Sequence, residues 1–267
     1  TFQCRRMNSF NHGRVLFVGD AAHQVSPFGA RGANSGIQDT DNLAWKLKLV
    51  IDGKAPPTLL DTYTEERGYA ADENIMNSTR STDFITPKSN TSKTFRNAVL
   101  ELAAKYPFAR ALVNSGRLSV PSWLARSSLN TPDSEAFDGD MIPGAPMADA
   151  PVLGDSGDGW LLRQLGNRFQ ALHYVEDASA LDAQAARTLG ELGYGGIGVE
   201  PIVLAQRGQA PAGLKTLLDS KGRLAQRYDL KPGTTYLARP DQHVAARWRG
   251  LDAARVKAAV ARATGNA

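Results

Sequence analysis

The stretch GDAAHQVSPFGARGANSGIQDTDNLAWKL, from Gly19 to Leu47, decides the fold. Four apolar residues, Val15–Val18, precede it and predict a short strand buried on both faces of a sheet. A glycine-rich loop follows, and residues 34–51 then show a helical pattern with one stripe formed by Ile37, Ala44, Leu47 and Ile51. Strand, turn, loop and helix in this order aim backbone N–H groups and the positive end of a helix at a ligand.

Asp20 is the first candidate for ligand binding. It comes at the carboxyl end of the expected strand, where open α/β sheets place ligand-binding groups, and a carboxylate can accept hydrogen bonds from sugar or polyol hydroxyls. Gly29, Gly32 and Gly36 allow a ligand to approach the backbone and allow φ > 0 where the loop needs it. The alternative is an ordinary turn that Asp20 caps. We favour a ligand, because the alternative does not explain the density of glycine together with Asp20 and Pro27.

The composition is that of a globular protein with a sizeable core, since 42% of the 267 residues are hydrophobic and 22% are charged. The net charge is only +4 and the basic residues are spread along the chain, so no nucleic-acid partner is expected. No apolar run approaches the roughly 20 residues that cross a bilayer, and no signal peptide is visible, so no membrane partner is expected. The lone cysteine, Cys4, rules out an internal disulfide or a cysteine metal cluster and suits a reducing cytoplasm.

Helices are expected through the rest of the first half of the chain. Asp52-Gly53 ends the first helix, and a second one runs from Pro57 to about Ser81. Residues 82–92 are polar and irregular, and Phe95, Val99, Leu102 and Ala103 mark another helix, with a further one over residues 109–118.

Strands alternate with helices in the second half. Residues 121–158 are rich in proline, glycine, serine and aspartate and predict a linker or an irregular crossover. The segments after it predict two strands, over residues 170–175 and 200–205, and two helices, over residues 181–192 and 251–263. A hairpin is expected between residues 223–228 and 235–239. We therefore predict a compact α/β module after a boundary near residue 140.

One glycine motif is misleading. Gly193–Gly198 matches G-x-G-x-x-G, the dinucleotide fingerprint, which has mechanical meaning only after a strand and before a helix. Here the helix comes before the motif and the strand after it. We interpret the motif as a glycine-rich exit from a helix.

The pattern GDAAHxxxPFGxxGxNxGxxDxxNLAWKL, with its lead-in Gly13–Val18, resembles the second flavin-binding motif of the FAD-dependent aromatic hydroxylases, the class A flavoprotein monooxygenases. Within that family it looks most like the phenol, pentachlorophenol and 3-(3-hydroxyphenyl)propionate hydroxylase branch, whose members often carry a C-terminal thioredoxin-like domain. The second module resembles that domain, including its ending YLARPDQHVAARW, from Tyr236 to Trp248. The implied fold is α/β: the C-terminal part of an FAD-binding (PHBH-like) domain over residues 1–140, then a thioredoxin-like domain over residues 141–267.

The resemblance also implies roles for residues of the glycine loop. Asp20 would hold a ribityl hydroxyl of FAD, and Pro27 would lie beside the isoalloxazine ring, with Gly29 in the same loop. The backbone of Gly32, Ala33 and Asn34 would meet the pyrimidine end of the flavin at the helix N-terminus, which stabilises negative charge there. Arg31 would bring a positive charge near the ring; the alternative is a loop arginine that faces solvent. Ser26-Pro27 replaces the two consecutive prolines of many relatives, which bears on the rigidity of the loop.

Other polar residues of this stretch are expected to be structural. His23 follows a strand end, and we expect a hydrogen bond from its side chain to the backbone of the turn rather than a catalytic role. Asp39, Asn42 and Trp45 are expected to pack and to make local hydrogen bonds. The remaining histidines are too scattered for a metal site, and we predict no catalytic side chain.

The implied function is that of a monooxygenase with FAD as cofactor and NADPH or NADH as co-substrate, which transfers oxygen from a flavin C4a-hydroperoxide to a phenolic or other aromatic substrate, with O₂ as the oxidant. The family's ADP-binding strand would lie upstream of Thr1, so we expect this chain to be a C-terminal portion that lacks the ADP-binding half. The second module has no C-x-x-C, which excludes thiol–disulfide exchange and leaves packing or a homodimer contact. The alternative is a non-catalytic interaction or assembly module with a redox-inactive thioredoxin-like fold.

Overall fold

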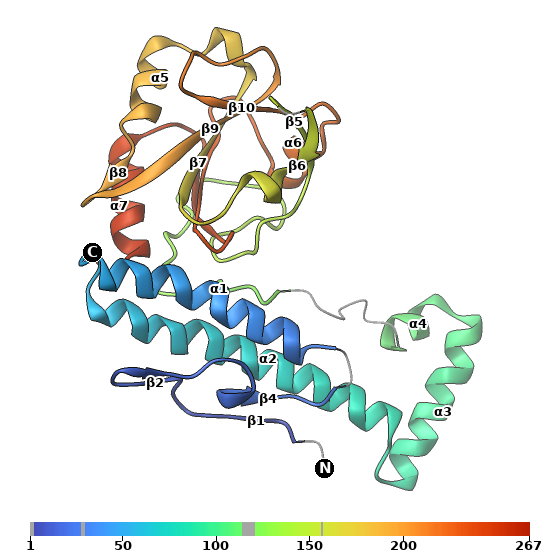
Figure 1. Ribbon diagram of the computed structural model, residues 1–267. Helices are drawn as coiled ribbons and strands as arrows, with labels where there is room; N and C mark the ends of the chain where they lie inside the picture. Colours follow the sequence, from blue (N-terminus) through green and yellow to red (C-terminus); the bar gives the residue numbers. More distant parts are fainter. Residues whose placement is uncertain (1–2, 28–29, 114–120, 156) are drawn as a thin grey trace. The chain divides into compact units, whose positions relative to one another are not determined.

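The computed structural model describes residues 3–27, 30–113, 121–155 and 157–267 (Figure 1). Its α-helices are α1 (Gly32–Ile51), α2 (Asp61–Ile85), α3 (Asn90–Lys105), α4 (Pro107–Val113), α5 (Ala183–Gly190), α6 (Arg223–Tyr228) and α7 (Ala253–Ala263). Its 3-10 turns are η1 (Gly19–Ala21), η2 (Pro57–Leu60), η3 (Leu161–Gln164) and η4 (Ala178–Ala180). Its strands are β1 (Arg5–Arg6), β2 (Asn11–His12), β3 (Val15–Leu16), β4 (His23–Gln24), β5 (Pro151–Gly154), β6 (Gly157–Trp160), β7 (Phe169–Asp177), β8 (Gly193–Tyr194), β9 (Ile197–Arg207), β10 (Lys215–Leu218), β11 (Thr235–Ala238) and β12 (Val244–Trp248). The expected α/β class is confirmed.

The contacts within the chain divide it into two compact units. Unit 1 consists of Thr1–Asp41 and Tyr63–Ser122, and unit 2 consists of Asn42–Thr62 and Trp123–Ala267. The first half of α1 therefore belongs to unit 1 and its second half to unit 2. The division into domains near residue 140 stays a prediction.

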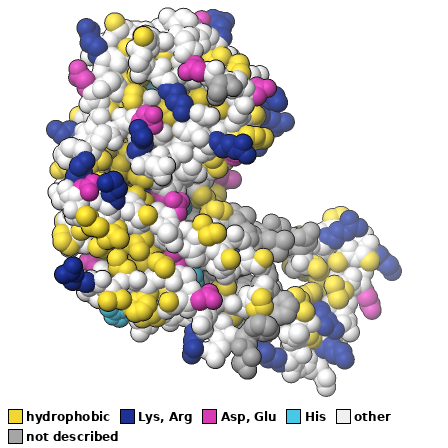
Figure 2. Space-filling view, viewed as in Figure 1, with side chains coloured by type: hydrophobic (Ala, Val, Ile, Leu, Met, Phe, Trp, Pro, Cys, Tyr) yellow, Lys and Arg dark blue, Asp and Glu magenta, His cyan; other side chains and the backbone are white. Residues whose placement is uncertain are grey.

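Helix α1 forms where the periodicity places it, and its end at Ile51 is followed by Gly53, whose φ of 67° is the left-handed conformation that closes helices. The predicted stripe is not its buried side, because Ile37 and Ile51 are 69% and 74% exposed. Figure 2 shows hydrophobic side chains gathered on the surface in the region of α1 and α2. In unit 1, the buried side of α1 presents the polar residues Ser35 and Asp39, which a hydrophobicity pattern cannot identify.

The strand predicted over Val15–Val18 is wrong in length and in burial. Only Val15–Leu16 is a strand, and it pairs antiparallel with Asn11–His12 across a tight turn at Gly13, where φ is 64°. Val15 and Val18 are 54% and 38% exposed. Among the described residues β3 has β2 as its partner, so a two-stranded hairpin replaces the strand buried inside a sheet.

The other helices of unit 1 agree with the sequence, with shifts at their ends. Helix α2 continues to Ile85, so the predicted irregular segment shrinks to residues 86–89. Ser89 caps α3, since its side chain accepts a hydrogen bond from the N–H of Ser92. The last predicted helix is observed as α4, and its final part, residues 114–118, lies outside the described residues.

Unit 2 contains a mixed sheet with strand order β12-β11-β7-β9-β10-β5-β6 and β8 paired with β9. β7 and β9 are parallel and lie on either side of α5 in the sequence, while β11 and β12 form an antiparallel hairpin beside β7. Residues after 150 thus form a sheet and not a helical bundle. A thioredoxin-like assignment for this module stays a prediction.

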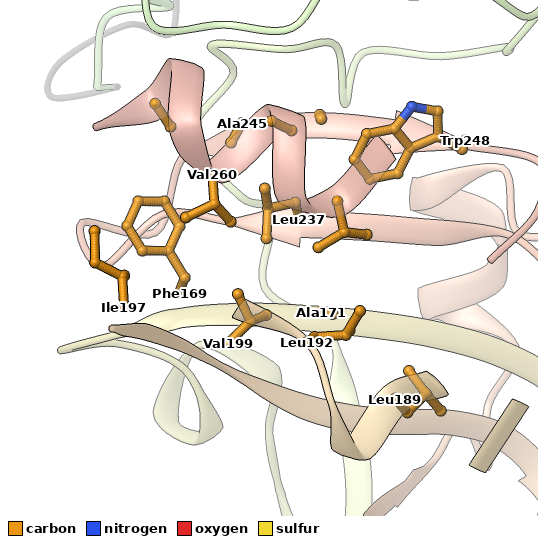
Figure 3. Packing of buried hydrophobic residues seen from close by; sticks show 14 of the residues in the cluster. Phe169, Ala171, Leu189, Leu192, Ile197, Val199, Leu237, Ala245, Trp248 and Val260 are labelled. Atoms are coloured by element: carbon orange, nitrogen blue, oxygen red, sulfur yellow. The ribbon is translucent and has the colours of Figure 1, made fainter. Parts of the chain in front are cut away.

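Each face of this sheet has its own core. Because side chains alternate along a strand, Val203 and Ala205 of β9 point to one face and Ile202 and Leu204 to the other. The first core includes residues of α5 and α7, and Figure 3 shows Leu189 and Val260 of these helices with Phe169, Ala171 and Leu237 of the sheet. The second includes Leu224 and Tyr228 of α6, so helices cover both faces.

The hairpin predicted over residues 223–228 and 235–239 is wrong. Residues 223–228 form helix α6, with Leu224 and Tyr228 buried one turn apart. The Asp219 carboxylate caps it, because it accepts hydrogen bonds from the N–H groups of Leu224 and Ala225 at 3.2 and 2.8 Å. Asp229, with a φ of 46°, ends it. The real hairpin pairs β11 with β12, one element later.

The G-x-G-x-x-G segment follows helix α5, as the sequence interpretation requires. Gly193–Tyr194 pairs with Ile197–Gly198 in a hairpin, and Gly195 and Gly196 between them have φ values of 54° and 77°. Both positions of such a two-residue turn need a positive φ, which glycine adopts readily. The segment therefore has no strand before it and no helix after it to bind a dinucleotide.

Candidate functional site

Asp20 lies in a 3-10 turn that packs closely on helix α1. Gly19 begins this turn with a φ of 58°, and a Cβ atom added to Gly36 of α1 would come within 3.3 Å of its Cα atom. Two glycines therefore permit the close approach of the turn to the helix. The Asp20 carboxylate has no hydrogen-bond partner among the described residues and is exposed, so the alternative in which it caps the turn is not observed.

A pocket of about 190 Å³ opens beside this carboxylate. Asp20 and His23 line it together with the two consecutive arginines Arg5 and Arg6. Arg6 is paired with the carboxylate of Asp72 at 2.6 Å. A pocket with one carboxylate and two guanidinium groups suits a ligand that carries hydroxyl groups as well as negative charge.

Asp39 holds the turn in place through three hydrogen bonds. Its Oδ2 atom accepts the N–H of Gly19 at 3.0 Å and Nε2–H of His23 at 2.6 Å. Its Oδ1 atom accepts Nε–H of Arg67, from helix α2, at 2.7 Å. The side chains of Asp39, His23 and Arg67 are all almost completely buried. The η1 turn, strand β4, helix α1 and helix α2 are thus joined at one buried carboxylate.

The electrostatics of this cluster favour the ionised carboxylate. Burial by itself would raise the pKa of Asp39, but the hydrogen bond from His23 and the charge of Arg67 hold that pKa below its ordinary value. His23 must donate through Nε2, because a carboxylate only accepts. Its buried Nδ1 atom has no hydrogen-bond partner among the described residues. The structural role expected for His23 is observed, with a carboxylate as partner in place of the turn backbone.

The glycine loop is tied to helix α2 on its other side. The hydroxyl of Ser78 donates to the carbonyl of Ser26 at 3.1 Å, and the hydroxyl of Thr82 contacts the hydroxyl of Ser26 at 3.2 Å. Pro27 is exposed, and its carbonyl accepts the N–H of Ala30 at 3.1 Å. Hydroxyl groups of helix α2 therefore anchor the loop at Ser26, one at its carbonyl and one at its side chain.

The first turn of α1 is partly exposed. Ala33 and Asn34 are exposed, Gly32 is half-buried, and the first turn contains no acidic residue. Arg31, directly before the helix, is buried and donates to Oδ1 of Asn74 at 3.1 Å, so the alternative of an arginine facing solvent is wrong. The first turn of a helix leaves N–H groups without intrahelical acceptors, which is the basis of anion binding there.

Not all of the glycines that were expected to adopt a positive φ do so. Gly32 and Gly36 lie in the helix without positive φ, whereas Gly19 and Ala30 take the left-handed conformation. Gly29 lies outside the described residues. The structure thus places Asp20 and the other described candidates, Pro27, Arg31, Gly32, Ala33 and Asn34, on one turn–loop–helix segment of unit 1.

Sequence reasoning missed Arg67. It lies in TYTEERG, in the middle of a helix where a charged residue is normally exposed, yet it is 2% exposed. The available signal was the spacing of two charged residues, Glu66 and Arg67, which lie three and four residues after Tyr63 and so share the buried side of the helix with it. The hydroxyl of Tyr63 donates to the carbonyl of Phe17 at 2.8 Å.

Several known proteins are similar to this chain in sequence or in structure. Residues 1–78 match the family described as FAD binding domain. A putative polyketide hydroxylase of Streptomyces halstedii is 31% identical over 93% of this chain and 42% of the relative. The 3-(3-hydroxy-phenyl)propionate/3-hydroxycinnamic acid hydroxylase of Paraburkholderia xenovorans is 29% identical over 92% of this chain and 46% of the relative. The crystal structure of the flavin-dependent monooxygenase PieE in complex with FAD and substrate superposes with a TM-score of 0.71 at 25% identity, covering 97% of this chain and 49% of that one.

The resemblance to FAD-dependent aromatic hydroxylases is therefore confirmed. The chain spans about half the length of the relatives that it matches. No helix of the described residues is long and apolar enough to span a membrane.

Proposed function

We propose that this chain, whose residues 1–78 are part of an FAD binding domain, forms the side of an FAD site that holds the flavin ring and the ribityl chain. The observation that carries the proposal is the Asp20 carboxylate. It is exposed at a pocket, it has no partner among the described residues, and it sits on a turn that the buried Asp39 fixes to helix α1. A fixed carboxylate without a partner suits the hydroxyls of a ribityl chain.

Each candidate residue has a defined task in this site. Asp20 accepts a hydrogen bond from a ribityl hydroxyl, and the backbone of Gly32, Ala33 and Asn34 binds the pyrimidine end of the ring. The positive end of the α1 dipole, with the charge of Arg31 next to it, stabilises negative charge there. Pro27 and Gly29 belong to the loop beside the ring. The flavin supplies the redox chemistry, and the residues of this chain bind it and orient it.

We propose further that these residues work in an aromatic hydroxylase that uses FAD, NADH or NADPH, and O₂ to hydroxylate a phenolic substrate. The names of the relatives support this activity. Because this chain spans about half of their length, we infer that the ADP-binding half of the site is supplied by residues outside it. We propose a cytoplasmic location, which suits the single cysteine, and a redox-inactive thioredoxin-like module that packs within the protein or contacts a second copy.

Titration with two flavins tests the proposal. We expect FMN and FAD to bind this chain weakly and with equal affinity, because none of the candidate residues contacts the ADP half. Quenching of flavin fluorescence gives both dissociation constants. Tight, stoichiometric binding of FAD by this chain alone would show that it also contains an ADP site. If neither flavin binds at its solubility limit, the interaction-module alternative gains support.

A further inference from the structure

A buried ion pair in the β11–β12 connection holds the second half of helix α1. Arg239 and Asp241 lie between the two strands, with side chains 0% and 1% exposed. Nε–H and Nη2–H of Arg239 donate to the two oxygens of Asp241 at 2.9 and 2.6 Å, a bidentate geometry. The backbone of Arg239 is fixed as well, because its N–H donates to the carbonyl of His243 at 2.8 Å.

Two residues of α1 contact this pair from one side of the helix. Asn42 donates through Nδ2 to Oδ2 of Asp241 at 3.1 Å. Trp45, three residues later, places its ring 5.3 Å from the guanidinium carbon of Arg239 and packs edge-on against Phe169 of β7. All of these residues belong to unit 2. The C-terminal module, defined as residues 123–267, therefore contacts α1 through charged and directional groups as well as through apolar ones.

Such an arrangement fixes position more strictly than apolar packing does. Burying two charges costs several kcal/mol, and well-packed apolar residues would stabilise the contact equally well. Burial opposes ionisation of Asp241, but Arg239 and His243 beside it hold its pKa well below its ordinary range, so the carboxylate stays charged. Apolar contacts of α1, such as Trp45 with Phe169, tolerate sliding, whereas the hydrogen bond from Asn42 is lost when the helix shifts along its axis or turns.

We propose that the Arg239–Asp241 pair is a positioning device for the second half of helix α1, the helix at whose first turn we propose that the flavin binds. The helix is a single element of 20 residues, about 30 Å long at 1.5 Å per residue. Asp39 fixes the same helix within unit 1. The purpose of holding the helix rests on the proposed function. The contact of this pair with the helix is independent of that function.

Hydrogen exchange of the intact chain, measured by mass spectrometry without flavin, tests the inference. Asp241→Asn keeps the size of the side chain and removes its charge. We expect amide exchange in peptides of α1 to rise by about tenfold or more, since hydrogen bonds to charged groups contribute about 1.5–3 kcal/mol. Exchange in β7 and β9, at the centre of the module, should stay as in the wild type.

The matched control is Asp133→Asn. Asp133 pairs with the buried Arg247 at 2.6 Å in the same module, and Arg247 also stacks on Phe137 of that module. It should raise exchange around β12 and leave α1 unchanged. If Asp241→Asn does not fold, Asn42→Ala decides, because it removes the hydrogen bond from the helix to Asp241, leaves Arg239 and Asp241 in place and should still raise exchange in α1. Unchanged α1 exchange, or a rise shared equally by β7 and β9, would overturn the inference. A failed flavin titration with raised α1 exchange would remove the proposed function and leave this inference standing.

Discussion

Replacing Asp39 by asparagine is expected to lower the free energy of unfolding by about 3–5 kcal/mol. The substitution keeps the size of the side chain but leaves the guanidinium of Arg67, 2% exposed, without its carboxylate partner. It also weakens the acceptor for the N–H of Gly19 and for His23. Urea unfolding followed by circular dichroism measures the change.

The control for this loss is Asp72→Asn. Asp72 pairs with Arg6 in the same unit at 2.6 Å, close to the 2.7 Å between Asp39 and Arg67, but its side chain is 57% exposed. Exposed ion pairs contribute about 0–1 kcal/mol, so this variant should unfold almost as the wild type does. Equal losses for the two variants would mean that burial is not what makes the Asp39 cluster important.

The pH dependence follows from the lowered pKa of Asp39. A carboxylate whose pKa is lower in the folded state stabilises the fold above its unfolded pKa, about 3.9, and this contribution is lost as the pH falls through the folded pKa. The difference in unfolding free energy between wild type and Asp39→Asn should therefore be largest above about pH 4 and shrink in more acidic solution. A difference that grows below pH 4 would contradict the assignment.

Replacing Asp20 by alanine is expected to weaken flavin binding by about 10- to 150-fold, the equivalent of about 1.5–3 kcal/mol for a hydrogen bond to a charged group. Its carboxylate has no partner among the described residues, so the melting temperature should hardly change. Quenching of flavin fluorescence measures the first quantity, and thermal unfolding of the flavin-free chain measures the second, because bound flavin would itself raise the melting temperature. Asp20→Asn is the control and should cost less, because its amide oxygen still accepts a hydrogen bond.

The reverse outcome would show that Asp20 stabilises the turn and does not bind flavin. If Asp20 served only the turn, the melting temperature would fall while the dissociation constant for flavin stayed at the wild-type value. In the full-length enzyme that we propose, hydroxylation should recover in both variants once flavin is saturating, because the ribityl contact lies away from the reacting part of the ring.

The sequence predicted the positions of elements that have a long local pattern, although it did not identify the buried side of α1. Helix α1 and strands β7 and β9 belong to this group, because long periodic segments specify their own structure. The short segments failed. Val15–Val18 is apolar like a buried strand, yet only Val15–Leu16 is a strand, in a partly exposed hairpin with Asn11–His12, since burial depends on partners that local sequence does not reveal. In the α6 segment the two buried residues, Leu224 and Tyr228, have helical spacing, and the cap from Asp219 supports the helix that the hairpin prediction missed.

The sequence predicted the exposed residues of the candidate site but not the buried residues that hold them in place. The position of Asp20 after a strand and before a glycine loop was visible as a pattern in consecutive residues. The Asp39 cluster was not, because His23, Asp39 and Arg67 are 16 and 28 residues apart and meet only through folding. For the same reason the contact between Asn42 and Asp241, 199 residues apart, has no local signal.

The central claim is that the turn after β3 and the first turn of α1 bind the flavin. The most direct measurement is an NMR titration of the isotope-labelled chain with FMN, which follows each backbone amide. We expect saturable shifts at Gly19–Ala22 and at Gly32–Asn34, with those of the Gly193–Gly198 hairpin unchanged. Shifts confined to the Gly193–Gly198 hairpin, or none at Gly19–Ala22 and Gly32–Asn34 when FMN is at its solubility limit, would contradict the claim.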